Sequence, residues 1–301
     1  MAEGKATGGA IQTVGIISKP RQQEIAELLP PLVSWLEQRS IRTLLDRETA
    51  GSLPPELRTR LDSAVMARGE LVARCDLIIV LGGDGTLLAA ARHARAVEVP
   101  ILAVNLGSLG FLTAVTIDEI YDSLERILKG KHQIDCRKRL QIQVVREGGE
   151  TVIYHALNDA VLNKGAISRI LDFETYVDGQ FLNLFKADGL IVSTPTGSTA
   201  YCLAAGGPIV YPAVEAFIIT PICSHTLTNR PLVVSDRSRI EVVVKTEAES
   251  VFLTVDGQVG LALHSGDRIV CELSSSRINL VRPAKKEFFE VLRSKLKWGE
   301  R

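Results

Sequence analysis

Two uninterrupted apolar runs constrain the fold of this chain most strongly. Leu77–Leu81 reads LIIVL and Pro100–Val104 reads PILAV, and the Ala- and Leu-rich stretch Thr86–Arg95 lies between them. Strands that are apolar on both faces are typical of parallel sheets covered by helices on two sides. The strand–helix–strand order therefore predicts an open, mostly parallel α/β sheet.

The first third of the chain repeats this alternation. A short strand is expected at Thr13–Ser18, followed by a helix at Arg21–Arg39, where apolar residues recur at helical spacing. A second strand is expected at Ile41–Leu45, and the polar stretch from Pro54 to Ala73 is expected to be helical. An amphipathic helix over Ile117–Leu128 completes this α/β domain.

The pattern changes near residue 135. Leu140–Val145 alternates strictly between apolar and polar residues, and the dipeptides Asp178-Gly179 and Asp256-Gly257 are typical of hairpin turns. Short strands joined by such turns predict an antiparallel, β-sandwich-like domain. The further strand candidates are 152–156, 170–177, 180–185, 190–193, 240–245, 251–255, 259–263, 268–273 and 278–282.

These patterns divide the chain into four segments. Residues 1–12 are expected to form a disordered tail and residues 13–135 the α/β domain. Residues 136–275 are expected to form the β-rich domain. Residues 276–301 carry an amphipathic helix and are expected to return to the first domain.

The composition excludes several classes of function. The chain has 35 Lys and Arg against 35 Asp and Glu, so it lacks the basic field that a nucleic-acid or membrane-surface binder needs. Its five cysteines form no C-x-x-C pair and its five histidines show no ligand spacing, which argues against a zinc site. Reduced thiols predict a cytoplasmic protein.

The segment Gly82-Gly83-Asp84-Gly85-Thr86 joins the strand Leu77–Leu81 to the next helix. Glycines at such a junction let the backbone approach a ligand, and the helix N-terminus offers N–H groups to an anion. The simpler alternative is a tight turn with Asp84 as the helix N-cap. Neither the dinucleotide-binding G-x-G-x-x-G motif nor the P-loop is present. A carboxylate in an anion site suggests a general base that acts on a hydroxyl, with a metal nearby.

Four more segments carry residues that could bind a ligand. Asn105 opens a glycine loop, in which Phe111 and Leu112 are expected to be core residues. Asn158-Asp159 can grip a ribose diol, or can form a local Asx turn. Ser193–Tyr201 concentrates hydroxyl groups before a helical stretch, where they can hold phosphate or cap the helix. Asp256-Gly257-Gln258 is expected to be a hairpin turn.

Together these motifs resemble the NAD kinases. The resemblance rests on GGDGT at 82–86, NLGSLGFLT at 105–113, Asn158-Asp159, DGLIVSTPTGSTAY at 188–201, HTLTNRP at 225–231 and DGQ at 256–258, in that order. It runs from about residue 13 to the KLKWG at 295–299. It implies transfer of the ATP γ-phosphate to the 2′-hydroxyl of the adenosine ribose of NAD, with Mg²⁺. It also implies a homodimer or homotetramer, with the β-rich domain serving NAD binding and oligomerisation.

The resemblance also implies roles for single residues. Asp84 would accept the proton, and Asn158 and Asp159 would hold the nicotinamide-side ribose. The other residues implied to line the NAD site are Gly85, Arg169, Lys186, Asp188, Thr199, Ala200, Tyr201, Ala204 and Gln258. The expected phosphate-binding residues are Gly82, Gly83, Gly85 and Thr86. Relatives more often carry Glu in place of Asp159, and many carry Ser in place of Ala204.

Two other functions are open at this point. GGDGT is shared with diacylglycerol-type lipid kinases, which would need an apolar cleft for acyl chains but have no use for STPTGSTAY. A non-catalytic dinucleotide sensor is the second alternative, against which the intact Asp84 argues. Small phosphate ligands are compatible with zero net charge, because backbone N–H groups and a helix N-terminus can build their site.

Overall fold

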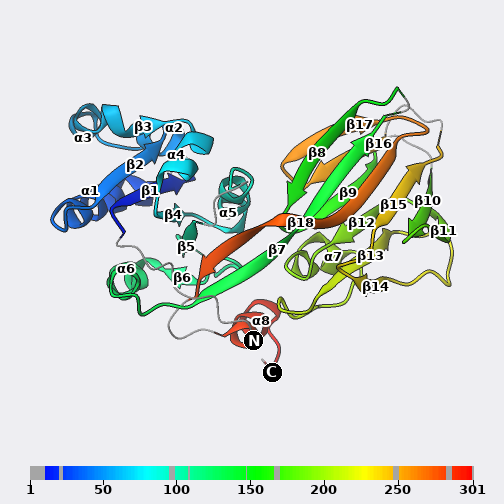
Figure 1. Ribbon diagram of the computed structural model, residues 1–301. Coiled ribbons are helices and arrows are strands. Elements are labelled where there is room, and N and C mark those ends of the chain that lie inside the picture. Colours follow the sequence, from blue (N-terminus) through cyan, green and yellow to red (C-terminus); the bar gives the residue numbers. More distant parts are fainter. Residues whose placement is uncertain are drawn as a thin grey trace. The chain divides into compact units, whose positions relative to one another are not determined.

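The computed structural model describes residues 11–19, 23–94, 99–107, 109–146, 148–165, 170–246, 251–282 and 287–299. The chain divides into two compact units, here called unit 1 (Met1–Cys136 with Ile278–Arg301) and unit 2 (Arg137–Arg277). Strands β7 (Ile134–Val145) and β18 (Arg268–Val281) carry the chain from one unit into the other (Figure 1). Residues 1–10 of the expected disordered tail lie outside the described residues.

Unit 1 is an α/β unit, as its alternating sequence pattern predicts. Its strands are β1 (Thr13–Ser18), β2 (Arg42–Asp46), β3 (Val65–Met66), β4 (Leu77–Leu81), β5 (Pro100–Asn105) and β6 (Val115–Thr116). Its helices are α1 (Gln23–Glu37), α2 (Arg47–Ala50), α3 (Pro55–Arg60), α4 (Arg68–Arg74), α5 (Asp84–Ala91), α6 (Ile120–Leu128) and α8 (Phe288–Leu296), with 3-10 turns at Asp62–Ala64 and Ile117–Glu119.

The strands of unit 1 form a parallel sheet in the order β5-β4-β1-β2-β3, and the end of β18 joins it in parallel beside β5. Every residue of β4 and β5 is buried, which is why both runs are uninterruptedly apolar. The strand order reverses between β1 and β4. In open α/β sheets, ligands bind at the carboxyl ends of strands at such a reversal.

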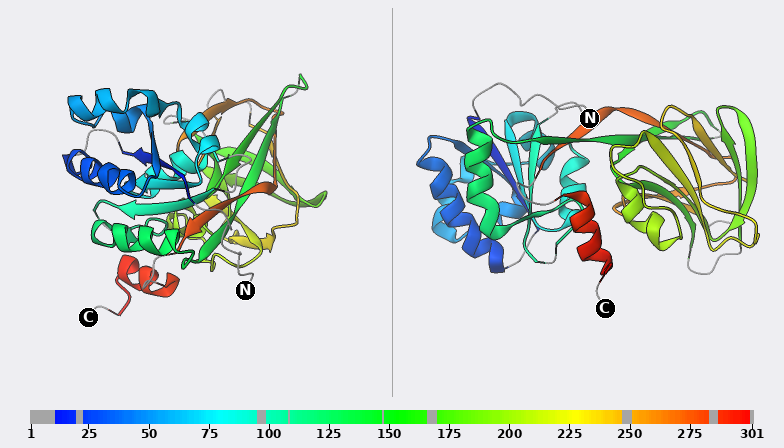
Figure 2. Two further views of the ribbon diagram at one scale, coloured as in Figure 1. Left: turned by 60° about the vertical axis from the view of Figure 1, so that its left-hand side comes forward. Right: turned by 90° about the horizontal axis from the view of Figure 1, so that it is seen from below.

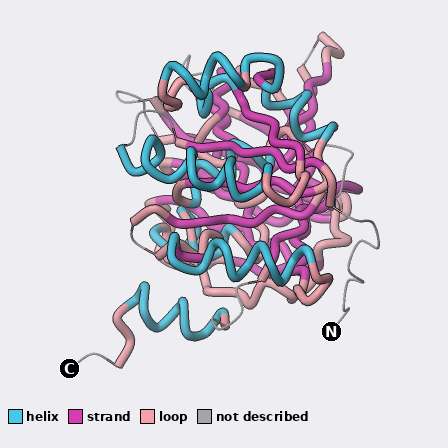
Figure 3. The backbone as a smooth tube through the Cα atoms, turned by 90° about the vertical axis from the view of Figure 1, so that its left-hand side faces the viewer, coloured by secondary structure: helices cyan, strands magenta, loops and turns pink. Residues whose placement is uncertain are grey.

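Helices cover both faces of this sheet, as the right-hand view of Figure 2 shows, and Figure 3 looks onto one of these helix-covered faces. Helices α1 and α6 lie on the same face (Figure 2). Leu29 of α1 and Leu124 of α6 belong to one apolar core, and the ring centroids of Trp35 and Tyr121 are 5.7 Å apart. Helix α4 lies on the other face. A Cβ on Gly15 of β1 would approach Leu71 of α4 to 2.5 Å, so this glycine permits the close packing.

One predicted helix of unit 1 was wrong. The polar stretch from Pro54 to Ala73 is not a single helix, because Val65–Met66 leaves the helical pattern as strand β3 and pairs in parallel with β2. Pairing with the open edge of the sheet satisfies backbone groups that the short helices α3 and α4 do not use.

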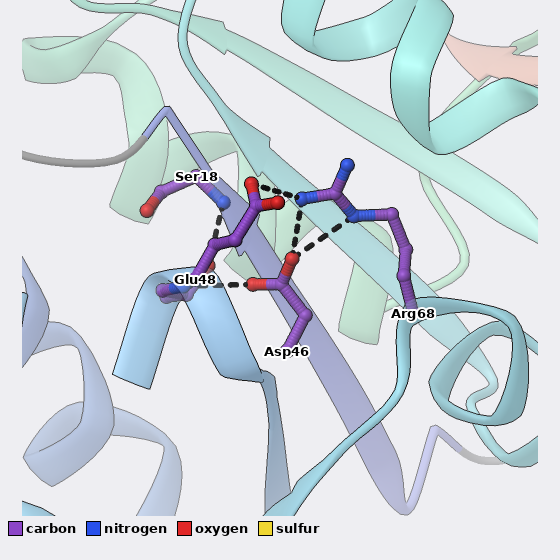
Figure 4. A network of polar contacts seen from close by, with 5 residues as sticks. Ser18, Asp46, Glu48 and Arg68 are labelled. Atoms are coloured by element: carbon purple, nitrogen blue, oxygen red, sulfur yellow. Dashed lines mark hydrogen bonds and ion pairs between the residues drawn. The ribbon is translucent and has the colours of Figure 1, made fainter. Parts of the chain in front are cut away.

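A charged network ties the carboxyl end of β2 to α2 and α4 (Figure 4). Asp46 is 2% exposed, accepts a hydrogen bond from the backbone N–H of Thr49 at 3.0 Å and pairs with the guanidinium of Arg68. Glu48 also pairs with Arg68, at 2.9 Å. Thr49 in turn accepts a hydrogen bond from the N–H of Ser18 at the end of β1.

Removing the cation of this network is expected to destabilise the fold. Arg68→Met leaves the buried Asp46 carboxylate without its partner, which should lower the free energy of unfolding by about 3 kcal/mol. The double variant Asp46→Asn, Arg68→Met removes both charges and keeps an acceptor for Thr49, so most of the stability should return. Urea unfolding measures both. Equal stabilities of the single and double variants would show that the ion pair contributes little.

Unit 2 is antiparallel and β-rich, which confirms the predicted fold class. Apart from parts of β7 and β18 it contains β8 (Thr151–Ala156), β9 (Asp159–Lys164), β10 (Leu171–Val177), β11 (Gln180–Ala187), β12 (Gly189–Ser193), β13 (Ala216–Ile222), β14 (Leu232–Ser235), β15 (Ile240–Val244), β16 (Val251–Val255) and β17 (Val259–Leu263). A 3-10 turn at Gly197–Thr199 leads into the short helix α7 (Tyr201–Ala204).

Two antiparallel sheets enclose the core of unit 2. One has the order β14-β13-β12-β9-β16-β17, and the other contains β11-β10-β15-β18 with β7 and β8. Phe173 and Ile142 of one sheet and Phe217 and Leu253 of the other belong to one buried cluster, as in a sandwich. Strands β9, β13 and β14 were absent from the sequence prediction.

Among the described residues, no helix is long and apolar enough to span a membrane. All five cysteines are free, and burial raises the pKa of the Cys75 and Cys271 thiols to about 12.

Candidate functional site

The glycine turn after β4 shapes the start of α5. Gly82 has a φ of 155°, and a Cβ there would meet Thr86 Oγ1 at 2.5 Å, so the position requires glycine. Gly83 is the N-cap of α5, with no side-chain oxygen to bind the first N–H groups of the helix. No heavy atom would lie within 4 Å of a Cβ at Gly83 or Gly85. The turn therefore leaves open space beside a helix N-terminus, where an anion can bind.

The Asp84 carboxylate is bound by a neighbouring loop and does not cap its own helix. Oδ1 accepts hydrogen bonds from the N–H of Leu112 at 3.1 Å, the N–H of Thr113 at 3.0 Å and the Thr113 hydroxyl at 2.9 Å. Oδ2 accepts one from the N–H of Phe111 at 3.0 Å. Among the contacts of the described residues, Oδ2 therefore has more remaining capacity to accept a proton than Oδ1.

The loop after β5 is built to hold Asp84. A Cβ on Gly110 would lie 2.1 Å from Asp84 Oδ1, so only glycine permits this approach. Asn105 is 5% exposed, and its side chain accepts from the N–H of Gly107 and donates to Thr113. Asn105 therefore shapes the loop. Phe111 and Leu112 are only partly buried, so their prediction as core residues was wrong.

Asn158 and Asp159 lie in unit 2, where β8 leads into β9. Asn158 is 9% and Asp159 4% exposed. Asn158 Oδ1 is buried and accepts no hydrogen bond from the described residues, which excludes the local Asx turn in this structure. A buried amide oxygen without a donor is unfavourable unless a ligand supplies one. Asn158 is therefore a strong candidate ligand-binding residue.

The hydroxyl-rich loop after β12 packs against the backbone of Asn158. The Asn158 carbonyl accepts hydrogen bonds from the Thr194 N–H at 2.8 Å and the Ser193 hydroxyl at 3.2 Å. The Thr194 hydroxyl donates to the Leu157 carbonyl at 2.6 Å and accepts from the N–H of Gly197. These hydroxyl groups have structural partners. Their role in this structure is to fix the loop onto Asn158.

Gly197 is expected to be irreplaceable in this packing. In Gly197→Ala the new Cβ would lie 2.2 Å from the Asn158 carbonyl oxygen and 2.6 Å from its carbon, so backbone must move. We expect a loss of about 1–3 kcal/mol in unfolding free energy. Thermal unfolding measures it. Gly260→Ala in β17 is the matched control, because a Cβ there has no atom within 4 Å. Equal melting temperatures would contradict the close approach.

Burial and a second carboxylate make Asp159 a weak acid. Its pKa is raised to about 7, first by burial and then by the negative charge of Asp256. An ionised Asp159 accepts strong hydrogen bonds from hydroxyl groups. The site that it forms with Asn158 is therefore suited to a ribose diol, and its affinity is expected to depend on pH near neutrality.

The other residues implied by the resemblance lie in several places of unit 2. Lys186 lies near the end of β11 and pairs with Asp172 at 3.3 Å, and Asp188 lies between β11 and β12 and pairs with Lys164 at 2.6 Å. Tyr201 is 44% exposed and Ala204 is exposed, both on α7. Thr199 and Ala200 lie just before this helix, and Gln258 lies in the turn between β16 and β17. Arg169 lies outside the described residues.

The sequence analysis missed the residues that hold Asp84, Asn158 and Asp159 in place. Gly110 and Thr113 contact Asp84, and Asp256 accepts hydrogen bonds from the backbone of residues 157–159. Asp256 was assigned only to its turn. Its side chain bonds residues about a hundred positions away, a pairing that local patterns do not contain. Glycines in NLGSLGFLT were the available signal for a close approach near 110.

Two protein-family models match this chain. Residues 14–132 match the ATP-NAD kinase N-terminal domain, and residues 157–283 match the ATP-NAD kinase C-terminal domain. The chain belongs to the ATP-NAD kinase family. The two matches of this family cover most of units 1 and 2, and they include both Asp84 and Asn158-Asp159.

Relatives of the family are similar over nearly the full chain. The NAD kinase of Solibacter usitatus is 50% identical over 97% of this chain and 99% of its own. The NAD kinase of Koribacter versatilis is 46% identical over 97% of this chain and all of its own. The crystal structure of yeast NADH kinase complexed with NADH has a TM-score of 0.89 at 27% identity, covering 98% of this chain and 89% of that one. An Archaeoglobus fulgidus NAD kinase shares the fold, with a TM-score of 0.73 at 23% identity, over 95% of this chain and 98% of that one.

Proposed function

We propose that this protein transfers the γ-phosphate of ATP to the 2′-hydroxyl of the adenosine ribose of NAD, which yields NADP and ADP. The ribose oxygen attacks the γ-phosphorus, the bond between that phosphorus and the β–γ bridging oxygen breaks, and the hydroxyl proton passes to Asp84. The observation that carries the proposal is the oriented Asp84 carboxylate at the carboxyl end of β4, in a chain of this family. General-base help of this kind contributes about 10²–10⁴-fold to a rate.

Each ligand is assigned to residues that suit its chemistry. Phosphate groups of ATP would bind at the glycine turn Gly82–Thr86, where the N-terminus of α5 presents N–H groups. The nicotinamide-side ribose would donate hydrogen bonds to Asn158 Oδ1 and Asp159. The remaining proposed NAD contacts are Gly85, Arg169, Lys186, Asp188, Thr199, Ala200, Tyr201, Ala204 and Gln258.

Magnesium is proposed to enter as part of the substrate MgATP. Among the described residues, no group of three or more His, Cys, Asp and Glu side chains could hold a metal ion. Mg²⁺ needs only one or two carboxylates when substrate phosphates supply the other ligands. The donor set of the chain therefore fits an ion carried by ATP, where it would neutralise charge on the transferred phosphate.

A direct assay tests the function and separates the alternatives. The purified protein with ATP, Mg²⁺ and NAD is expected to form NADP, detected with an NADP-specific dehydrogenase. Turnover of diacylglycerol without NADP formation would favour a lipid kinase, and NAD binding without turnover would favour a sensor. Family matches over residues 14–132 and 157–283 do not favour either alternative.

A homo-oligomer is proposed as the working form in the cytoplasm, through two edge strands of unit 2, β11 and β14. The edge strands β11 and β14 expose Phe181 (59%), Leu184 (40%) and Val233 (48%), more apolar surface than solvent-facing edges usually carry. A second copy of the chain could cover them.

Sedimentation velocity tests this assembly. The wild-type protein is expected to sediment as a dimer or tetramer, and Val233→Asp is expected to shift it toward the monomer. Ile153→Asp on β8 is the control, since Ile153 is similarly exposed (50%) on a different strand. A monomeric wild-type protein would overturn the assembly, and an unaffected Val233→Asp oligomer would exclude β14 as its interface.

A further inference from the structure

Asp256 holds the backbone of the candidate ribose-binding residues. Its Oδ2 accepts a hydrogen bond from the N–H of Leu157 at 2.9 Å. Its Oδ1 accepts from the N–H groups of Asn158 at 2.7 Å and Asp159 at 3.1 Å. In return, the N–H of Asp256 donates to the Asp159 carbonyl at 3.0 Å. One carboxylate therefore satisfies three successive N–H groups at the point where Asn158 and Asp159 present their side chains.

The fold brings Asp256 to this position through strand pairing. β16 and β9 are antiparallel, with Val255 opposite Ala160, so the residue after β16 lies beside the residue before Ala160. Asp256 then begins the hairpin turn with a φ of 50°, followed by Gly257 at 64°. Asp tolerates this left-handed conformation better than most residues, but a turn alone does not require its carboxylate to contact a distant segment.

A buried cation balances the charge of Asp256. Burial raises the pKa of Asp256, whereas the three N–H groups and the positive charge of Arg139 lower it. Arg139 on β7 is only 1% exposed, and its guanidinium also donates to the His155 carbonyl at 3.1 Å and to the Ser276 hydroxyl at 3.3 Å. A fully buried Arg is costly unless it is paired, so its location beside Asp256 points to a maintained negative charge there.

We propose that Asp256 is a positioning residue that fixes Asn158 and Asp159 for the nicotinamide-side ribose, with Arg139 as its balancing charge. This inference rests on the proposed NAD kinase function. Asp256 donates nothing to the substrate itself. It keeps the Asn158–Asp159 backbone in one conformation from one side, while Thr194 and Ser193 hold the Asn158 carbonyl from the other. Preorganisation of this kind lowers the cost of binding.

Asp256→Asn tests the proposal, with Asp178→Asn as the matched control. Asp178 begins the other Asp-Gly hairpin turn, with a φ of 52°. Among the described residues, its side chain accepts a hydrogen bond only from the N–H of Arg239. In Asp256→Asn the amide presents N–H groups to a backbone donor, and KM for NAD should rise about tenfold. KM for ATP should stay near its wild-type value. Asp178→Asn should change neither constant.

The pH profile provides a readout that a merely structural role would not move. Among the described residues, the ionisable groups that interact electrostatically with Asp159 are Asp256 and Cys202. Arg139 interacts electrostatically with Asp256. Loss of the Asp256 charge removes a repulsion, so the acid limb of kcat/KM for NAD should move to lower pH by about one unit. The same limb in Asp178→Asn should match the wild type.

Asp256→Glu covers the case in which Asp256→Asn does not fold. The longer side chain keeps the charge opposite Arg139 but displaces the oxygens, so KM for NAD should rise while the acid limb stays in place. A wild-type KM for NAD in a folded Asp256 variant would overturn the positioning role. Failure of the wild-type protein to make NADP would instead overturn the proposed function, so the two failures are distinguishable.

Discussion

Asp84→Asn is expected to lower kcat by about 10²–10⁴-fold while NAD binding persists. The amide cannot accept the proton of the 2′-hydroxyl, which is the role assigned to the carboxylate. The amide oxygen can replace Oδ1, which accepts from Leu112 and Thr113. The amide nitrogen would then face the N–H of Phe111, a contact that costs stability but leaves the loop its other bonds. Steady-state kinetics with NAD and MgATP measure the effect.

Thr113→Val is the control for the structural part of this role. It removes the hydroxyl that donates to Asp84 at 2.9 Å but keeps the carboxylate and the backbone donors. Its kcat should remain close to wild type, and thermal unfolding should show how much each variant loosens the loop. A near-normal kcat in a folded Asp84→Asn protein would remove Asp84 from the chemical step.

Asp159→Asn is expected to lower kcat/KM for NAD by about 10²-fold. The ionised carboxylate forms charge-assisted hydrogen bonds with ribose hydroxyls, each stronger than a neutral bond by about 1–1.5 kcal/mol. Asp159→Glu is the matched control, because it retains the charge and is the residue that the resemblance associates with this position. We expect Glu to preserve most activity. Equal activity of the Asn and Glu variants would exclude a role for the charge.

Asp159→Asn is also expected to stabilise the fold at alkaline pH. The folded pKa of Asp159, about 7, lies above the value of about 3.9 in an unfolded chain. The stability contribution of a carboxyl group with a raised pKa is fully present below pH 3.9 and is lost as the pH rises through 7. Asp159→Asn should therefore raise Tm by about 4 °C or more at pH 8, with a smaller gain at pH 5. Thermal unfolding at both pH values checks this, and a gain independent of pH would contradict it.

In the wild-type protein, the ionisation of Asp159 should also be visible in the pH dependence of KM for NAD. KM for NAD is expected to fall between pH 6 and pH 8 as Asp159 ionises, whereas a substrate bound only by backbone groups shows no such trend. Ionisation of Asp159 is therefore expected to increase the affinity for NAD and to decrease the stability of the fold. The buried carboxylate that binds the ribose destabilises the unliganded protein at the pH where it binds best.

Hydrophobic patterns predicted the fold class because burial acts residue by residue. The uninterrupted runs of β4 and β5 could be identified as strands buried on both faces, and the alternation in β7 as a strand buried on one. Strands β3 and β14 could not be predicted, because two residues or a partly exposed edge leave little periodic signal. Their conformation depends on pairing with a neighbouring strand.

The motifs of the sequence also marked where polar ligands could gather, and the domain models agree on the family. The assignments of single residues to NAD and ATP stay predictions. Asp84 was identified because a carboxylate among glycines at a strand end is chemically unusual. Its partners at 111–113 were not, because these partners are backbone N–H groups, which every residue except proline carries.

The sequence by itself determined an α/β segment, a β-rich segment and a set of phosphate- and ribose-binding candidates. Those conclusions depend on local spacing and on chemical type, which the order of residues contains. Only the tertiary structure decided how the candidates are held. Gly110 lies against Asp84, Gly197 lies against Asn158, and Asp256 bonds the backbone before β9. These contacts join residues that are between 26 and about a hundred positions apart, so they exist only once the sheets have formed.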